Sequence, residues 1–194
     1  MTKKLINVLI SFFILILGAV GLAIITTGDD NFADLNNFFN PPVSGMKITS
    51  SAFSNHQAIP TTFTCNGDNT NPPLQFSDIP SQAKSLVLLV EDPDAPQPNW
   101  LHWLVYNIPP QTTSIAQNSL PDQATQGTND FDTTRYQGPC PPLGQHRYNF
   151  KLYALDQATS FPPGSTRQAI ESAIDGHVIA TAELIGIYQR PDDR

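Results

Sequence analysis

Proline is the residue that most limits what this chain can fold into. The sequence of 194 residues contains 18 prolines, and each one fixes its own φ angle and removes a backbone N–H donor. Such a chain has room for few long helices, so loops and strands are expected. Two proline-rich segments, residues 92–96 and 138–142, each precede a histidine at the start of a strand-like stretch. A rigid loop that delivers an imidazole to one place pre-organises a small binding site.

The apolar pattern from residue 46 onward is that of a mainly β protein. Residues 85–91 form a short continuous apolar run, which is typical of a strand buried on both faces. Three further strands are expected at residues 102–108, 146–155 and 177–188. The polar stretch from residue 110 to residue 137 has few large apolar side chains and is predicted to be a long loop.

The strand that follows the second proline segment also predicts the direction of its side chains. Successive residues of a strand point to opposite faces of the sheet. His146 and Tyr148 therefore share a face with Phe150 and Leu152 and point toward the core, whereas Arg147 points away from it.

One helix is predicted near the C-terminus. Ser165 is expected to cap it, and Gln168 stands at the position that completes a capping box. Apolar residues at helical spacing follow within residues 169–174, and Gly176 is expected to end the helix.

The N-terminus predicts export. Lys3 and Lys4 precede an apolar run over residues 5–25, close to the roughly 20 residues that span a bilayer. We therefore expect residues 1–27 to be a transmembrane anchor with a cytoplasmic N-terminus, or alternatively a cleaved signal peptide. Residues 28–45 are expected to be a juxtamembrane linker. The remaining domain would lie on the periplasmic or extracellular side, or be secreted after cleavage.

The charge balance argues against nucleic acid as a partner. The net charge is -7, with 17 acidic and 10 basic residues. Two of those basic residues stand in the N-terminal segment, and no basic cluster occurs elsewhere. Such a domain repels phosphate backbones.

The chain contains two cysteines, Cys65 and Cys140. Outside the cytosol an even number of cysteines favours a disulfide, and each stands beside one of the distinctive loops. The other reading is two small buried side chains that never meet. Both readings stay open at this point.

The residues that could bind a ligand or act in catalysis stand next to the proline segments. Asp92 ends one apolar run, His102 begins the next strand, and His146 and Tyr148 follow the second segment. A carboxylate orients a nearby histidine and favours its charged form, which can hold an anion such as a phosphate head group. Anion affinity would then strengthen as the pH falls through about 6 to 7. In the blander reading, Asp92 caps its own turn and each histidine is an ordinary strand residue.

Two catalytic readings use the same residues. In a hydrolase, Asp92 and His102 would act as an orienting group and a base, but no serine stands in a nucleophile-elbow pattern. Two histidines and an aspartate would also suit zinc, yet no metal-binding spacing is present. We therefore expect a protein that is not an enzyme and needs neither metal nor cofactor, with the hydrolase as the alternative.

Several segments resemble the phosphatidylethanolamine-binding protein family, in particular its bacterial Raf-kinase-inhibitor-like branch. The resemblance covers about residues 46–191, and Phe76 departs from it where the bacterial pattern usually has Trp. The segments that carry the resemblance are Thr64-Cys65-Asn66-Gly67, Asn71-Pro72-Pro73-Leu74, Asp92-Pro93-Asp94-Ala95-Pro96, Trp100-Leu101-His102-Trp103-Leu104-Val105, Gly138-Pro139-Cys140-Pro141-Pro142, Gly144-Gln145-His146-Arg147-Tyr148, and residues 176–188.

The resemblance implies a fold and a site. The fold would be a β-sandwich of two antiparallel sheets with one or two short helices near the C-terminus. The site would be an anion pocket formed by Asp92, His102, His146 and Tyr148, with Pro141 and Pro142 in the adjoining loop. The implied function is to bind a small anionic ligand or a phospholipid head group, or to inhibit or regulate a protein partner that the sequence does not identify. A protease inhibitor of this fold would use a surface outside the pocket.

Overall fold

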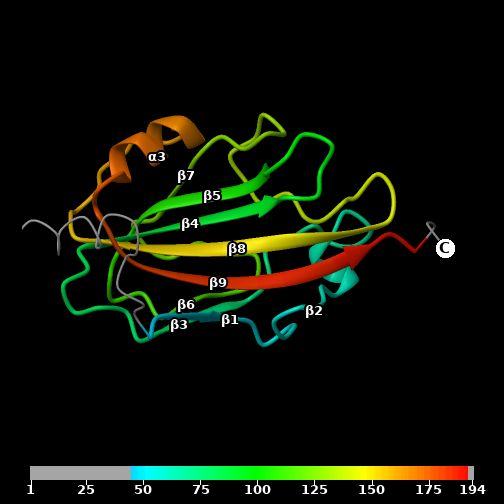
Figure 1. The fold of residues 1–194 in the computed structure, drawn as a ribbon, viewed down its shortest axis with the longest axis horizontal. Helices are drawn as coiled ribbons and strands as arrows, with labels where there is room; N and C mark the ends of the chain where they lie inside the picture. The colour runs from blue at the N-terminus through cyan, green and yellow to red at the C-terminus, as the bar shows by residue number, and fades with distance from the viewer. Residues whose placement is uncertain (1–44, 192–194) are drawn as a thin grey trace, which may run out of the picture. The chain divides into compact units, whose positions relative to one another are not determined.

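The computed structural model describes residues 45–191 (Figure 1). The predicted anchor or signal at residues 1–27 and nearly all of the linker lie outside these residues. Within residues 45–191, no helix has the length and apolar character needed to cross a membrane.

Nine strands in the described part of the chain form two sheets. The larger sheet has six strands in the order β2-β9-β8-β4-β5-β7, and the smaller has three in the order β1-β3-β6. The strands are β1 (Lys47–Thr49), β2 (Gln57–Ala58), β3 (Leu74–Ser77), β4 (Ser85–Asp92), β5 (Trp100–Ile108), β6 (Ser114–Ile115), β7 (Thr125–Gln126), β8 (Gln145–Leu155) and β9 (Val178–Gln189). The four strands predicted from the sequence correspond to β4, β5, β8 and β9, with ends that differ by at most two residues.

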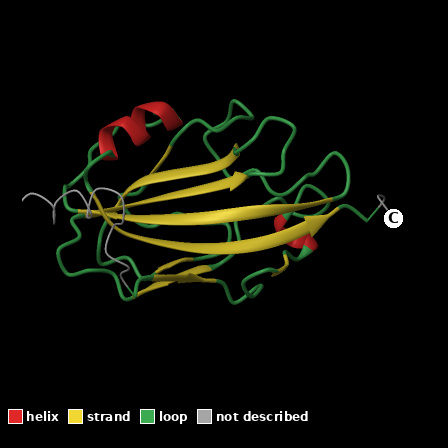
Figure 2. Cartoon of the chain, in the orientation of Figure 1, coloured by secondary structure: helices red, strands yellow, loops and turns green. Residues whose placement is uncertain are grey.

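The larger sheet is covered on both faces. On one face lies the smaller sheet, whose apolar residues share a core with alternate residues of β4 and β8, such as Leu88 and Phe150. On the other face lies helix α3 (Arg167–Ile174), which packs Ile170 and Ile174 against Val87 and its neighbours. Figure 2 shows helix α3 and the strands of the smaller sheet on opposite sides of the long strands. Every residue of β4 is buried, as its continuous apolar run predicted.

Two details of topology differ from the expectation of purely antiparallel sheets joined by a long loop. Strand β2 pairs with β9 in parallel, so the larger sheet is mixed. The predicted loop at residues 110–137 contains two short strands, β6 and β7, which extend the two sheets. Each of these strands has only two residues, so neither shows an apolar alternation that a sequence pattern can detect.

The predicted helix exists, but its cap is displaced by one residue. The hydroxyl of Thr166 accepts a hydrogen bond from the Ala169 N–H at 3.3 Å. The Ser165 hydroxyl instead donates to the carbonyl of Pro162 at 2.8 Å, which closes the turn before the helix. The prediction of Ser165 as the cap, with Gln168 in a capping box, was therefore wrong. Gly176 follows the helix with a φ of +75°, a conformation that glycine adopts without strain.

A buried acid ties the helix to the sheet. Glu91 is only 5% exposed, and its side chain projects from the middle of the larger sheet. One carboxylate oxygen accepts from the ammonium of Lys151 on β8, and the other accepts from Arg167 of α3 at 2.6 Å. Arg167 also donates to the carbonyl of Asn99 in the loop between β4 and β5.

Replacing this acid is expected to destabilise the domain. Glu91→Ala leaves Lys151 and Arg167 without their shared anion, and breaking a buried ion pair in this way costs about 3 kcal/mol. Urea denaturation should show this loss in the free energy of unfolding. Glu183→Ala, which removes an exposed acid of β9, is the matched control and should cost less than about 1 kcal/mol. Equal losses in the two variants would contradict a structural role for the Glu91 ion pairs.

Candidate functional site

The end of β4 and the start of β8 meet at a hydrogen bond between Asp92 and His146. The His146 Nδ1 atom lies 2.8 Å from Asp92 Oδ2. The second oxygen of Asp92 accepts from the backbone N–H of Asp94 at 2.9 Å. Asp92 is 3% exposed and His146 7% exposed. A carboxylate so deeply buried needs partners, and here both of its oxygens have one.

His102 reaches the same place through a β-bulge. The pairing of β4 with β5 shifts between Val90↔Trp103 and Glu91↔Leu101, so His102 is the extra residue. Its ring meets the ring of Tyr148 edge to face, with centroids 5.2 Å apart. Trp103, the next residue, also belongs to the core between the two sheets. The bulge therefore turns two consecutive side chains to one face, which regular alternation forbids.

The loop after β7 holds the bulged backbone. The carbonyl of His102 accepts from the side-chain amide of Asn129 at 3.0 Å and from the N–H of Gln137 at 3.1 Å. The His102 Nδ1 atom lies 2.7 Å from the carbonyl of Gln137. Because a carbonyl only accepts, Nδ1 carries the proton. In the neutral ring Nε2 is then an acceptor.

Burial lowers the pKa of His102 below its ordinary value of 6.5, although the Gln137 carbonyl and the carboxylates of Asp92 and Asp130 oppose this shift. Asp92 favours the charged imidazole of His102, as the sequence suggested, but burial outweighs this effect. The cost of desolvating a cation in this position exceeds the attraction of the nearby acids.

Tyr148 places a buried hydroxyl near Asp92. Its side chain is fully buried, and its hydroxyl has no hydrogen-bond partner among the described residues. Burial raises the pKa of Tyr148, and the nearby Asp92 carboxylate raises it further, so the phenol keeps its proton. A buried hydroxyl without a partner is rare in native structures. We call Asp92, His102, His146 and Tyr148 the Asp92 cluster.

The first proline segment is attached to β8 through an exposed ion pair. Asp94 accepts from the backbone N–H and the Nε of Arg147, both at 2.9 Å, and from its terminal nitrogen at 2.7 Å. This contact lowers the pKa of Asp94 to about 2. As the alternation predicted, Arg147 points away from the core. It fixes the segment whose backbone N–H binds Asp92.

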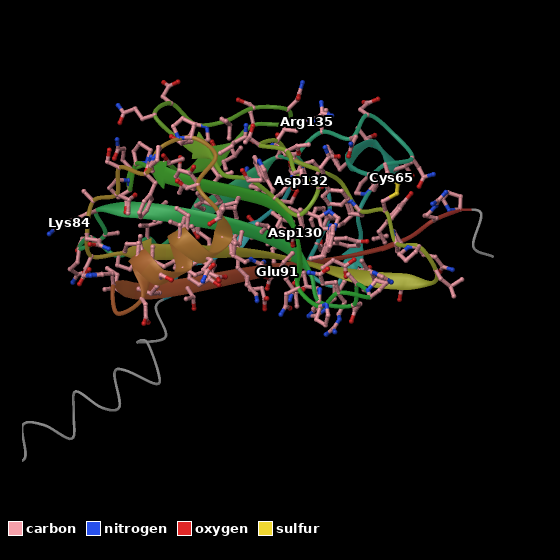
Figure 3. The ribbon with its side chains drawn as sticks, turned by 90° about the horizontal axis from the view of Figure 1, so that it is seen from above. Cys65, Lys84, Glu91, Asp130, Asp132 and Arg135 are labelled. Carbon is pink, nitrogen blue, oxygen red and sulfur yellow. A yellow bond between two sulfur atoms is a disulfide. The ribbon has the colours of Figure 1, made fainter. Side chains whose placement is uncertain are left out.

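The second proline segment is attached to residues 63–69. A disulfide joins Cys65 to Cys140, which is one of the two readings that the sequence left open. The Cys65 N–H donates to the Pro139 carbonyl at 3.1 Å. The side chain of Asn69 donates to Gln137 at 3.1 Å and accepts from the Gly138 N–H at 2.7 Å. In Figure 3, Cys65 and Lys84 lie toward opposite ends of the molecule.

Apolar groups lie beside the cluster. Pro141 is buried and Pro142 is exposed, and the next residue, Leu143, is 77% exposed. On the other side, the partly exposed ring of Phe131 packs edge to face on His102 with centroids 5.1 Å apart. It contacts Trp100 in the same way.

The structure brings together all four residues that were predicted to form the pocket, but it pairs Asp92 with His146 rather than with His102. Sequence reasoning missed Asn69, Phe131 and Gln137. Asn69 is an amide in a polar loop, and Gln137 acts mainly through its main chain. Neither residue has a signal in the sequence. Among residues 45–191, no group of three or more His, Cys, Asp or Glu side chains is arranged to hold a metal ion. The cluster offers hydroxyl and imidazole hydrogen-bonding groups to a ligand.

Comparisons with known proteins show which family model and which proteins the chain matches. The family model described as phosphatidylethanolamine-binding protein matches residues 49–189. A UPF0098 protein of Methanothermobacter thermautotrophicus is 45% identical over 150 residues, which cover 75% of this chain and 99% of that protein. A UPF0098 protein of Chlamydia trachomatis is 46% identical over 150 residues, which cover 75% of this chain and 99% of that protein.

Two solved structures have a similar fold. One is a phosphatidylethanolamine-binding protein homolog from Chlamydia trachomatis, with a TM-score of 0.73 and 45% identity over 76% of this chain and 99% of that one. The other is Escherichia coli YbcL, described as a new member of the mammalian PEBP family, with a TM-score of 0.70 and 32% identity over 75% and 98% of the two chains.

The lowered pKa of His102 predicts a pH dependence of stability. In the unfolded chain His102 binds a proton near pH 6.5, whereas the folded protein resists that proton. The contribution of His102 to stability is therefore complete above pH 6.5 and is lost as the pH falls from there toward the lower pKa of the folded state. Urea denaturation at several pH values should show that the free energy of unfolding falls less at low pH in His102→Asn than in the wild type. The amide of this variant can still donate to the Gln137 carbonyl. Identical profiles for the two proteins would contradict a buried neutral His102.

Proposed function

Because the chain belongs to the phosphatidylethanolamine-binding protein family, we propose that its Asp92 cluster binds a phosphate-bearing ligand without catalysing its conversion. The observation that carries the proposal is the buried Tyr148 hydroxyl, which has no partner among the described residues. A ligand oxygen is the natural acceptor for this donor.

The proposal also explains how a site that contains a carboxylate accepts an anion. Each oxygen of Asp92 already accepts a hydrogen bond, one from His146 and the other from the N–H of Asp94. Asp92 thus orients the His146 ring through its Nδ1 atom and leaves the Nε2 atom to bind the ligand. The repulsion between ligand and carboxylate is offset by this imidazole and by the Tyr148 phenol.

His102 adds a preference for one ionic form of the ligand. Its Nδ1 proton is committed to the Gln137 carbonyl, so its Nε2 atom accepts a hydrogen bond. A phosphate monoester that retains one acidic proton, or a head group with an ammonium, brings a donor to this atom. Sulfate at neutral pH brings none. We therefore expect phosphate monoesters and phosphoethanolamine to bind better than sulfate.

The apolar surroundings favour an amphiphilic ligand over free phosphate. Leu143, three residues before His146 in the chain, is 77% exposed, and Phe131 is 39% exposed beside His102. Exposed apolar groups beside a polar site are suited to the glycerol and acyl part of a lipid. The proposed ligand class is therefore a phospholipid head group with its adjoining chain.

The same proposal covers location and partners. Residues 5–25 would anchor the chain in the cell membrane, with the binding domain on the periplasmic or extracellular side. The apolar run and the two preceding lysines support this orientation. A domain held there would meet lipid head groups directly, and it could inhibit or regulate a protein partner through the occupied site.

Hydrolysis stays as an alternative because the Asp92–His146 pair has the geometry of a base and its orienting group. Both cysteines of the chain are joined in the disulfide, so neither thiol is available as a nucleophile. Turnover of p-nitrophenyl phosphate or p-nitrophenyl acetate by the wild type, abolished by His146→Ala, would favour this alternative.

Calorimetric titration tests the assignment of the ligand. Phosphate, phosphoethanolamine and dihexanoyl-phosphatidylethanolamine are titrated into the protein, and His146→Ala is expected to weaken binding about tenfold or more, since it removes a hydrogen bond to a charged group. His177→Ala is the matched control, because His177 also contacts an aspartate, Asp156, at 2.9 Å but lies outside the cluster. The absence of binding to all three probes would overturn the proposal, and so would equal affinities for the two variants.

A second variant tests the Tyr148 hydroxyl. Tyr148→Phe removes a buried group that has no partner in the domain, so the free energy of unfolding should stay the same or rise. The affinity for phosphoethanolamine should fall about fivefold, because a typical hydrogen bond contributes about 1 kcal/mol. A variant that loses stability but keeps its affinity would show that the hydroxyl serves the fold and not the ligand.

A further inference from the structure

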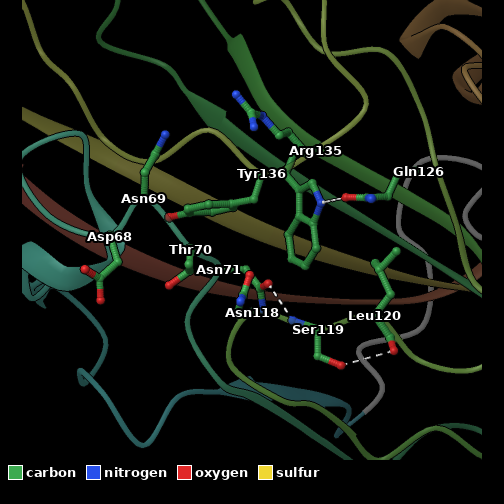
Figure 4. A pocket seen from close by; sticks show the side chains of 11 residues that line it. Asp68, Asn69, Thr70, Asn71, Asn118, Ser119, Leu120, Gln126, Arg135 and Tyr136 are labelled. Carbon is green, nitrogen blue, oxygen red and sulfur yellow. Dashed lines mark hydrogen bonds between the residues drawn. The ribbon is translucent and has the colours of Figure 1, made fainter.

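The domain contains a polar cavity that is separate from the Asp92 cluster. Its volume is about 480 Å³, within the range of small-molecule sites. Figure 4 shows its lining, which comes from the loop before β3, from the loop between β6 and β7, from the loop after β7, and from β5 and β7. The residues are Asp68, Asn69, Thr70, Asn71, Trp103, Asn118, Ser119, Leu120, Gln126, Arg135 and Tyr136. We call it the amide cavity.

The amide cavity shares no side chain with the Asp92 cluster, although the two are neighbours in the chain. At the bulge on β5, His102 contacts Tyr148 of the cluster, whereas Trp103 lines the cavity. In the loop after β7, Gln137 binds His102, whereas Tyr136 lines the cavity. The two sites can therefore be tested independently.

Several groups in the cavity wall are held in place by the fold itself. The Trp103 indole donates to the side-chain oxygen of Gln126 at 2.6 Å. The Tyr136 hydroxyl donates to the Phe63 carbonyl at 3.0 Å. The side chain of Asn71 donates to the Ala116 carbonyl at 2.9 Å and accepts from the Ser119 N–H at 3.1 Å. The wall is thus built before any ligand arrives.

One polar group of the cavity wall has no partner in the described part of the chain. The Thr70 hydroxyl is buried and makes no hydrogen bond to any described residue. Asp68, Asn118 and Arg135, whose side chains are exposed, and Gln126 also line the cavity. These groups supply both donors and acceptors.

The composition of the lining points to a neutral, polyhydroxylated ligand. Asp68 and Arg135 balance each other in charge, so the cavity does not select a net anion as the Asp92 cluster does. The rings of Trp103 and Tyr136 meet edge to face with centroids 5.6 Å apart and form an apolar part of the wall. A sugar combines hydroxyls, which both donate and accept, with apolar C–H faces. We propose that the amide cavity binds a carbohydrate of one or two rings.

The test is a titration of the whole protein, labelled with ¹⁵N, with N-acetylglucosamine and with maltose. Millimolar binding is expected to shift the backbone amide signals of residues 68–71 and 118–120. Thr70→Val should weaken binding about fivefold, the effect of one hydrogen bond. It should not lower the free energy of unfolding, because the lost hydroxyl has no partner in the domain.

Thr159→Val is the matched control, since Thr159 also has a buried hydroxyl without a partner among the described residues but lies outside the cavity. Sugar affinity should stay unchanged in this variant. Asn118→Ala, which removes an exposed side chain, should weaken binding to a similar degree as Thr70→Val. His146→Ala should leave sugar binding intact, and Thr70→Val should leave phosphoethanolamine binding intact.

Three outcomes would overturn the proposal. The first is the absence of amide shifts with either sugar at millimolar concentration. The second is sugar binding that Thr70→Val and Asn118→Ala leave unchanged, which would place the sugar elsewhere. The third is displacement of the sugar by inorganic phosphate at residues 68–71, which would assign the cavity to anions.

Discussion

The burial of β4 on both faces is the constraint on which the rest of the structure depends. A strand without a solvent face must have a layer on each side, and here these are the smaller sheet and helix α3. The acids at its end, Glu91 and Asp92, are buried with it and require partners. Glu91 uses its partners to hold the helix on the sheet. Asp92 points its carboxylate to β8 and creates the site.

The site in turn depends on a loop that is attached at several points. The segment from Tyr136 to Cys140 is joined to residues 63–69 by a disulfide, by the side chain of Asn69 and by the Tyr136 hydroxyl. Gly138 is packed so closely against the Phe63 carbonyl that the segment has no room for a Cβ atom there. Its backbone then fixes the ring of His102. The Gln137 carbonyl of this loop thus determines which tautomer the buried His102 ring adopts.

Some features of the site were predictable because they depend on local periodicity. Alternation along β8 placed His146 and Tyr148 on the buried face and Arg147 on the exposed one, and the structure agrees. Other features were not predictable because they depend on register. The bulge at His102 arises where the pairing of two strands slips by one residue, and no pattern within β5 signals it. For the same reason the hydrolase reading paired Asp92 with His102, whereas the register between β4 and β8 brings His146 to it.

By itself, the sequence determined the mainly β fold, the four long strands, the C-terminal helix and the residues of the Asp92 cluster. Proline content, apolar runs and short motifs are local properties, so they can be recognised from the sequence alone. The tertiary structure alone decided the parallel pairing of β2, the partner of Asp92, the neutral state of His102 and the existence of the amide cavity. These features depend on contacts between segments distant in the chain and on the burial that such contacts produce. Burial sets both the cost of a charge and the need of each polar group for a partner.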